Sequence, residues 1–228
     1  MLTETDKRFQ KFLRQFLTSH RFETFERILQ LRTRHFTVVL EDLFQSRNAS
    51  ACLRSCDCFG IQDLHVIENV NRFEDDSEIS LGASQWLTIH RHRDGDFKTE
   101  ECYRKLRENG YRIVATTPRD NATLLANIDV TQKSAFVFGT EMQGLSQVAL
   151  EEADERLRIP LYGFSESLNI SVSVALCLHD LIEKLHATQL DWGLREEEKE
   201  FLRFEWTQET LGKRIPELER EFTRRERE

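Results

Sequence analysis

Short apolar runs alternate with amphipathic segments through the middle of the chain. Runs rich in β-branched and aromatic residues predict strands over about 36–40, 63–68, 86–90, 111–117, 134–138 and 156–161. Helical spacing of apolar residues predicts helices over about 48–59 and 96–109, each closed by a glycine, and another from 169 onward. Strands that alternate with helices indicate a mainly parallel sheet with helices on both faces, so we expect the α/β fold class.

Both ends of the chain have helical patterns and no strand signal. Phenylalanine and leucine recur at helical spacing over about 6–34, which predicts two helices, and the charged segment after 191 predicts one or two more. We therefore divide the chain into a basic helical arm (1–35), a central α/β domain (36–190) and a C-terminal helical extension (191–228).

Charge is distributed unevenly along the chain. The formal net charge is −8, yet residues 1–35 hold eight Lys and Arg against four Asp and Glu. A basic arm on an acidic body indicates that the arm binds a polyanion. A solvated pair of amphipathic helices would give the same count of charged residues. The candidate phosphate-binding residues are Arg8, Arg14, Arg21, Arg27, Arg32 and Arg34.

Hydropathy and cysteine usage indicate where in the cell the protein is located. No apolar run of about eighteen residues and no signal-peptide pattern occur, so we expect a soluble, cytoplasmic protein without a membrane segment. The cysteines are odd in number and lie in apolar or helical contexts, which favours reduced thiols. Cys52, Cys56 and Cys58 lack a matching Cys/His pair downstream, so we interpret them as small buried apolar residues and expect no structural metal.

Three polar loops follow predicted strands, where open α/β sheets gather ligands: 45–54, 139–146 and 163–169. In the second loop, Gly139 and Gly144 have the outer spacing of a phosphate-binding P-loop. However, Leu145 stands where that motif needs lysine, and Glu141 would repel phosphate. A ligand that is neutral or cationic at this point suits the loop better.

The first and third loops carry polar residues at the N-termini of the helices that follow them. Asn48 and Arg54 lie near the start of the first predicted helix, where an N-cap and a surface arginine would explain them equally well. Ser167 or Asn169 is expected to cap the last helix while facing anything bound at the strand end. A capped core helix of any α/β protein would show the same pattern.

Three motifs occupy these loops: N-A-S-A-C-L-R-S-C-D-C-F-G (48–60), F-V-F-G-T-E-M-Q-G-L-S (136–146) and I-P-L-Y-G-F-S-E-S-L-N-I-S-V-S-V-A (159–175). In order and spacing they closely resemble the SPOUT superfamily of RNA methyltransferases, specifically the TrmH-type (SpoU) ribose 2′-O-methyltransferases. The general resemblance extends over about 36–190.

The resemblance implies that S-adenosylmethionine is held at the second and third loops, which this family ties into a deep C-terminal trefoil knot. Matching positions imply that Glu141, Ser167 and Asn169 complete the wall of the pocket. The residues implied to contact the cofactor, largely through the backbone, are Thr116, Gly139, Gly144, Ile159 and Leu168.

The resemblance also places Asn48 and Arg54 at the acceptor ribose, with Arg54 activating the 2′-hydroxyl. A guanidinium holds its proton tightly and is a poor base. An equally good account has Arg54 clamp a phosphate and stabilise the developing alkoxide. Both roles stay open.

The helices before and after the central domain resemble those of family members that methylate a guanosine ribose in the tRNA D-loop (guanosine-18) and act as homodimers. The alternatives are 2′-O-methylation of another tRNA position or of ribosomal RNA, and a knotted RNA-binding module without catalysis. The intact set of candidate catalytic residues argues against the last of these.

Overall fold

The computed structural model describes residues 2–43, 45–73, 77–119, 121–140 and 143–226. The described chain divides into two compact units: residues 33–192 form the larger one, and the two terminal segments, 1–32 and 193–228, together form the other. The two terminal segments, predicted as separate extensions, pack together as one helical unit.

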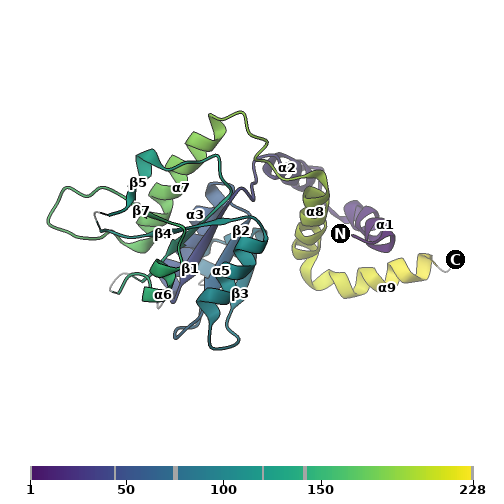
Figure 1. Ribbon diagram of the computed structural model, residues 1–228. Coiled ribbons are helices and arrows are strands. Elements are labelled where there is room, and N and C mark those ends of the chain that lie inside the picture. Colours follow the sequence, from purple (N-terminus) through teal and green to yellow (C-terminus); the bar gives the residue numbers. More distant parts are fainter. Residues whose placement is uncertain (1, 44, 74–76, 120, 141–142, 227–228) are drawn as a thin grey trace. The chain divides into compact units, whose positions relative to one another are not determined.

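The larger unit is built on a seven-stranded sheet in which every neighbouring pair is parallel (Figure 1). The strand order is β3-β2-β1-β6-β4-β7-β5. The strands are β1 Phe36–Glu41, β2 Asp63–Ile67, β3 Thr88–His92, β4 Arg112–Thr116, β5 Thr123–Leu124, β6 Ser134–Phe138 and β7 Glu155–Arg158. The predicted α/β class with a parallel sheet is confirmed.

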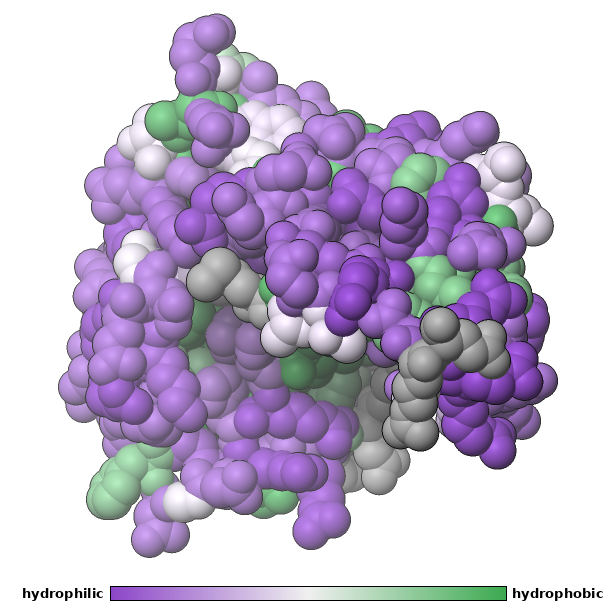
Figure 2. Space-filling view, turned by 90° about the vertical axis from the view of Figure 1, so that its right-hand side faces the viewer, coloured by the Kyte–Doolittle hydropathy of each residue, from purple (hydrophilic) through white to green (hydrophobic). Residues whose placement is uncertain are grey.

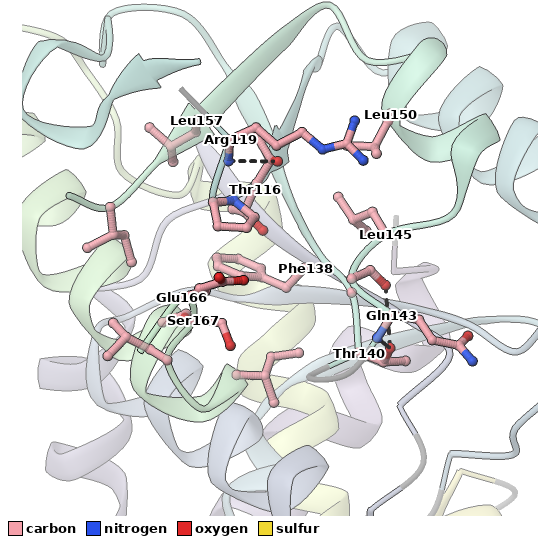
Figure 3. A pocket seen from close by; sticks show the side chains of 18 of the residues that line it. Thr116, Arg119, Phe138, Thr140, Gln143, Leu145, Leu150, Leu157, Glu166 and Ser167 are labelled. Carbon is pink, nitrogen blue, oxygen red and sulfur yellow. Dashed lines mark hydrogen bonds between the residues drawn. The ribbon is translucent and has the colours of Figure 1, made fainter. Parts of the chain in front are cut away.

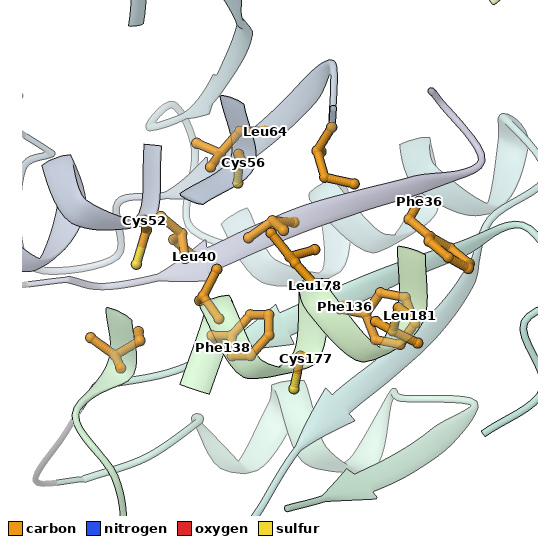
Figure 4. Packing of buried hydrophobic residues seen from close by; sticks show 14 of the residues in the cluster. Phe36, Leu40, Cys52, Cys56, Leu64, Phe136, Phe138, Cys177, Leu178 and Leu181 are labelled. Carbon is orange, nitrogen blue, oxygen red and sulfur yellow. The ribbon is translucent and has the colours of Figure 1, made fainter. Parts of the chain in front are cut away.

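Helices cover both faces of this sheet because alternate strand residues are apolar on both sides. Leu40 of β1 belongs to a core with α3 (Ser46–Cys58) and α7 (Ile170–His186), as Figure 4 shows. The neighbouring Val39 belongs to a second core with α5 (Lys98–Glu108) and α6 (Gln147–Glu151). Strands β1 and β6 lie at the centre and are buried throughout, so the sheet is the rigid platform for whatever its loops hold.

The boundaries of these elements follow local chemistry. Helices α3 and α5 are followed by Gly60 and Gly110 at φ +73° and +80°, the left-handed conformation that the sequence predicted for closing glycines. Strand β7 ends at Arg158, earlier than predicted, just before Pro160, which has no N–H to donate. Strand β5 was not predicted, because two residues are too few to show a period.

The cysteine prediction is right for two members of the triplet and wrong for the third. Cys52 and Cys56 face the core and are fully buried, but Cys58 is exposed at the last turn of α3. All the cysteines are free thiols.

The smaller unit packs phenylalanine rings from both ends of the chain. Phe9 lies 6.1 Å from Phe204 and 5.1 Å from Phe222, and Phe25 lies 5.5 Å from Trp206, measured between ring centroids. These contacts join helices from opposite ends of the sequence. Neither terminal segment could bury these aromatic rings by itself. The helices are α1 Glu4–Leu13, α2 Ser19–Leu29, α8 Glu196–Leu211 and α9 Ile215–Arg225.

The remaining described elements are short. They are helix α4 (Ser77–Ser80) and four single-turn 3₁₀ segments at Arg14–Phe16, Ala83–Trp86, Leu125–Asn127 and Gly212–Arg214.

The surface in Figure 2 is mostly hydrophilic, with apolar residues in small separate patches. This agrees with a chain of which 32% is charged. Among the described residues, no helix has both the length and the apolar character that a membrane crossing needs.

Candidate functional site

A cavity of about 510 Å³ lies at the carboxyl ends of three adjacent strands, β6, β4 and β7 (Figure 3). Its walls include Phe138 and Thr116, the last residues of β6 and β4, and Leu157 of β7. Parallel strands end at one edge of a sheet, so the loops that follow them converge there. A cavity of this size can enclose a small organic ligand.

The loop after β6 borders this cavity and is closed by its own backbone. Thr140 and Gly144 exchange both N–H···O hydrogen bonds at 3.0 Å, and Gln143 donates its backbone N–H to the Thr140 hydroxyl at 3.1 Å. A Cβ at Gly139 would lie 2.3 Å from the carbonyl carbon of Gly144, so only glycine fits there. A Cβ at Gly144 would meet no atom within 4 Å, but the residue has φ +71°, so glycine is favoured there for its backbone conformation.

Two kinds of group line the cavity. In Figure 3, Leu145 and Leu150 stand on one side, while Glu166 and Ser167 stand on the opposite side. Arg119 also lines the cavity and is anchored by its backbone N–H, which donates to the Thr117 hydroxyl at 3.3 Å. The site can therefore hold a flat apolar group against leucine side chains while polar groups orient the rest of the ligand.

The polar residues of the first and third loops meet directly. The Asn169 amide Nδ2 donates to Asn48 Oδ1 at 3.2 Å. Asn169 also caps α7, because its Oδ1 accepts from the N–H of Ser171 at 2.9 Å and from the Ser171 hydroxyl at 2.6 Å. Of the two predicted capping residues, Asn169 is the one that caps the helix. Asn48 lies in the first turn of α3, which begins at Ser46, so it is not itself the N-cap.

Arg54 does not point the same way as Asn48. Six positions along an α-helix correspond to about 9 Å of rise and a rotation of about 120°. Arg54 is exposed on α3 and is not among the residues that line the cavity. Glu141 lies outside the described residues.

The structure gathers most of the predicted cofactor site. Ser167 lines the cavity, as do all five residues predicted to contact the cofactor: Thr116, Gly139, Gly144, Ile159 and Leu168. Thr117, Arg119 and Glu166 also line the cavity and were not predicted. Thr117 and Arg119 directly follow β4, so the rule that ligands gather at strand carboxyl ends could have found them.

The six candidate phosphate-binding arginines differ in exposure. Arg8, Arg21 and Arg27 are exposed, whereas Arg14 and Arg34 are partly buried. The Arg34 guanidinium is paired with Asp63 at 2.7 Å. Arg32 is 1% exposed and lies 5.6 Å from the centroid of the Trp206 ring, so its prediction as a phosphate contact is wrong: a buried guanidinium cannot reach RNA.

Two histidines and a cysteine cluster away from the cavity, where β2 and β3 pack under α5. The donor atoms of His65, His92 and Cys102 lie within 4.8 Å of one another. His65 Nδ1 and His92 Nε2 are 3.1 Å apart, so one ring donates to the other. Burial lowers the pKa of His65 to about 3 and that of His92 to about 4, and burial raises the pKa of the Cys102 thiol. Without a metal, the two rings are therefore neutral and the thiol is protonated at neutral pH, and a metal ion bound here would have to displace the thiol proton.

The chain is similar in sequence and in fold to known RNA methyltransferases. The SpoU rRNA Methylase family matches residues 35–179. A tRNA (guanosine(18)-2′-O)-methyltransferase of Borreliella burgdorferi is 38% identical over 199 residues, which cover 87% of this chain and 89% of that protein.

Among solved structures, the A. aeolicus TrmH/SpoU tRNA modifying enzyme has a TM-score of 0.75 and 25% identity, covering 85% of this chain and 98% of that one. The SpoU methyltransferase AviRb from Streptomyces viridochromogenes, in complex with the cofactor AdoMet, has a TM-score of 0.60 over 70% of this chain and 64% of its own. At 21% identity, this second likeness shows the shared fold.

Proposed function

This chain belongs to the SpoU rRNA Methylase family, and on that premise we propose that it transfers a methyl group from S-adenosylmethionine to the ribose 2′-hydroxyl of guanosine 18 in the D-loop of tRNA. The observation that carries the proposal is the juxtaposition of the cavity after β6, β4 and β7 with the Asn48–Asn169 pair. A tRNA substrate would be met in the cytoplasm.

The residues around the cavity fit S-adenosylmethionine. Phe138, Leu157 and Ile159 provide apolar surface for the adenine ring, and the Gly139 backbone can approach it without a side chain. The Glu166 carboxylate at the wall would attract the positive charge of the cofactor. The loop has Leu145 where a triphosphate-binding loop would need lysine.

S-adenosylmethionine would supply an electrophilic methyl group on a sulfonium. Transfer would form a bond between this carbon and the ribose oxygen, break the carbon–sulfur bond to leave neutral S-adenosylhomocysteine, and pass the hydroxyl proton to water. The chain's own residues orient the hydroxyl for in-line attack, which is where much of the rate arises. Asn169 and Asn48 would orient the ribose; the support is that their side chains are hydrogen-bonded to each other at the N-terminal ends of α7 and α3. Arg54 would act on the acceptor nucleotide from a different side of α3 than Asn48, since its exposed guanidinium is accessible to an RNA phosphate or ribose.

We infer that the chain leaving β7 is threaded through the preceding loop as a trefoil knot. Strand β7 lies between β4 and β5, and both Thr116 and Thr123 are in register with Leu157. The short connection from β4 to β5 therefore crosses β7 at the level of Leu157, and the segment after Leu157 has to pass it. Threaded chains are nearly absent from other folds, so this crossing supports the family assignment.

A homodimer is proposed on the apolar surface of α7. Val172 and Leu176 are one helical turn apart and each is 45% exposed. In the preceding loop, Tyr162 and Phe164 are almost fully exposed, which is unusual for aromatic side chains of a monomer. Sedimentation should show a dimer that Leu176→Lys dissociates, whereas the matched Val148→Lys on α6 should leave the dimer intact.

The function is tested by tritium transfer from labelled S-adenosylmethionine to unmodified tRNA, followed by mass-spectrometric mapping of the product. We expect the label on the ribose of a D-loop guanosine. Arg54→Ala should lower turnover by about 10²–10³ while cofactor affinity stays unchanged. Label on another tRNA nucleotide would overturn the assigned substrate. Label in ribosomal RNA would do the same, and ribosomal RNA is the substrate that the family's description names. RNA binding without any transfer would overturn the enzymatic assignment and leave an RNA-binding module.

A further inference from the structure

A buried carboxylate, Glu41, lies behind the loop that borders the cofactor cavity. It is the last residue of β1, is 2% exposed, and is not among the residues that line the cavity. A carboxylate is costly to bury unless its oxygens accept hydrogen bonds, so its donors identify what it holds in place.

The donors to Glu41 come from three separate segments. Ser146 contributes two of them: its backbone N–H lies 2.8 Å from Oε2, and its hydroxyl lies 2.8 Å from Oε1. The Thr99 hydroxyl of α5 donates to Oε1 at 2.8 Å, and the Asn69 amide lies 3.5 Å from the same oxygen. Hydrogen bonds to a carboxylate are stronger than bonds between neutral groups, so both Glu41 oxygens act as an anchor.

The anchored residue, Ser146, ends the loop that follows β6. Its neighbours Leu145 and Gln147 both line the cavity, so its position sets theirs. The Ser146 hydroxyl also accepts from the Ala149 N–H at 3.1 Å and thereby caps α6. The other end of the loop is held by β6, where Phe138 is paired with Leu40 of β1. Strand β1 therefore controls both ends of the loop, one through its backbone and one through Glu41.

The residue after Glu41 anchors the acceptor side of the site. Asp42 has φ +58°, a conformation that is strained for a residue other than glycine. Its carboxylate accepts from the backbone N–H groups of Val70 at 2.7 Å and Asn71 at 3.0 Å, which holds the start of the segment that leads to Asn48. Two adjacent carboxylates thus fix the cofactor loop and the acceptor segment to the same strand end.

We propose that Glu41 is a positioning residue that holds Leu145, Ser146 and Gln147 where S-adenosylmethionine requires them; this inference rests on the proposed function. It does not touch the ligand. An amide in its place would turn an N–H₂ group toward donors that need an acceptor, which would release the end of the loop without changing the shape of the side chain.

The test is Glu41→Gln, with S-adenosylmethionine affinity measured by titration calorimetry and tRNA methylation measured at varied cofactor concentration. We expect the Kd and KM for the cofactor to rise by about 5- to 100-fold, the range for losing the partner of a buried hydrogen-bonding group. The kcat at saturating cofactor should stay within about twofold, because the acceptor site is untouched.

The matched control is Thr37→Val, a buried residue of the same strand whose hydroxyl donates to the Asp63 carbonyl at 2.7 Å. It should lower the melting temperature without changing cofactor affinity, which separates positioning from general destabilisation. Should Glu41→Gln fail to fold, Ser146→Ala removes one of the two hydrogen bonds that Ser146 donates to Glu41, together with the cap of α6, and should still weaken cofactor binding by about 3- to 10-fold.

Unchanged cofactor affinity in a folded Glu41→Gln protein, or in Ser146→Ala if Glu41→Gln does not fold, overturns the positioning role alone. If the wild-type protein fails to bind S-adenosylmethionine, the proposed function and this inference fall together.

Discussion

The side chains of Asn48 and Asn169, 121 positions apart in the sequence, are joined by a hydrogen bond of 3.2 Å. This contact brings together the first turn of α3 and the N-cap of α7, two helices that pack on the same face of the sheet. Asn169 thus has two separable roles, since its oxygen caps α7 and its amide nitrogen reaches Asn48.

Replacing Asn169 by serine should separate these roles. Serine caps helices about as well as asparagine, so the free energy of unfolding should change little. A serine side chain is too short to reach Asn48, so single-turnover methyl transfer should fall by about 10- to 100-fold through misplacement of the acceptor. Asn169→Ala is the control, because it should also lose about 1 kcal/mol of stability. A serine variant with wild-type transfer rates would contradict the orienting role.

The two glycines of the cofactor loop should respond differently to alanine. Gly139→Ala places a Cβ 2.3 Å from the Gly144 carbonyl carbon, so the loop has to open and S-adenosylmethionine binding should be lost. Gly144→Ala meets no atom within 4 Å and suffers only the strain of φ +71°, about 1–2 kcal/mol. Gly144→Val, β-branched at this conformation, should bind the cofactor least among the Gly144 variants. Calorimetry that ranks Gly144→Ala below Gly139→Ala would refute this assignment.

The exposed arginines of α1 and α2 should contribute to tRNA affinity through counterion release. Changing Arg8, Arg21 and Arg27 together to glutamine should weaken tRNA binding and flatten its salt dependence by up to about one unit of log–log slope per lost phosphate contact. The same change at Arg104, an exposed residue of α5, is the matched control and should leave the slope unchanged. Arg32→Gln should lower the melting temperature, because Arg32 is buried. An unaltered salt slope in the triple variant would place the tRNA elsewhere.

Stability should fall as the pH is lowered through the range in which histidine is normally protonated. Burial lowers the pKa of His65 to about 3 and that of His92 to about 4, so the unfolded chain binds more protons than the native one from about pH 6.5 down to these values. The stabilisation is complete above about pH 6.5 and is lost as the pH falls toward about 4, with a slope of at most about 1.4 kcal/mol per pH unit for each ring.

Urea denaturation between pH 7 and 4.5 checks this prediction. His65→Phe should lower the slope of the unfolding free energy against pH by up to the contribution of one proton, about 1.4 kcal/mol per pH unit. Equal slopes for the wild type and His65→Phe would show that other groups control the acid sensitivity.

Much of the α/β unit could be predicted from local patterns. The run of Phe36 to Leu40 is apolar on both faces, which is typical of a buried parallel strand, and Gly110 closes its helix in the conformation that only glycine adopts readily. The motif around Gly139 pointed to the cavity because ligands gather where parallel strands end. These features depend on neighbours within a few residues, so the sequence is sufficient to reveal them.

Other features depend on packing between segments that are distant in the chain. A count of charges could not show that Arg32 is buried while Arg27 is exposed. Arg32 is buried beside Trp206, which requires the two ends of the chain to pack together. The register that sets β7 between β4 and β5 is likewise invisible locally, and so is the approach of Ser146 to Glu41 across 105 positions. The sequence by itself determined the strand–helix alternation, the closing glycines and the polar loops, because these follow from backbone conformation and local hydropathy. Only the tertiary structure decided which loops share a cavity, which arginines face solvent and which carboxylate anchors the cofactor loop, because each is a property of contacts formed once the sheet is assembled.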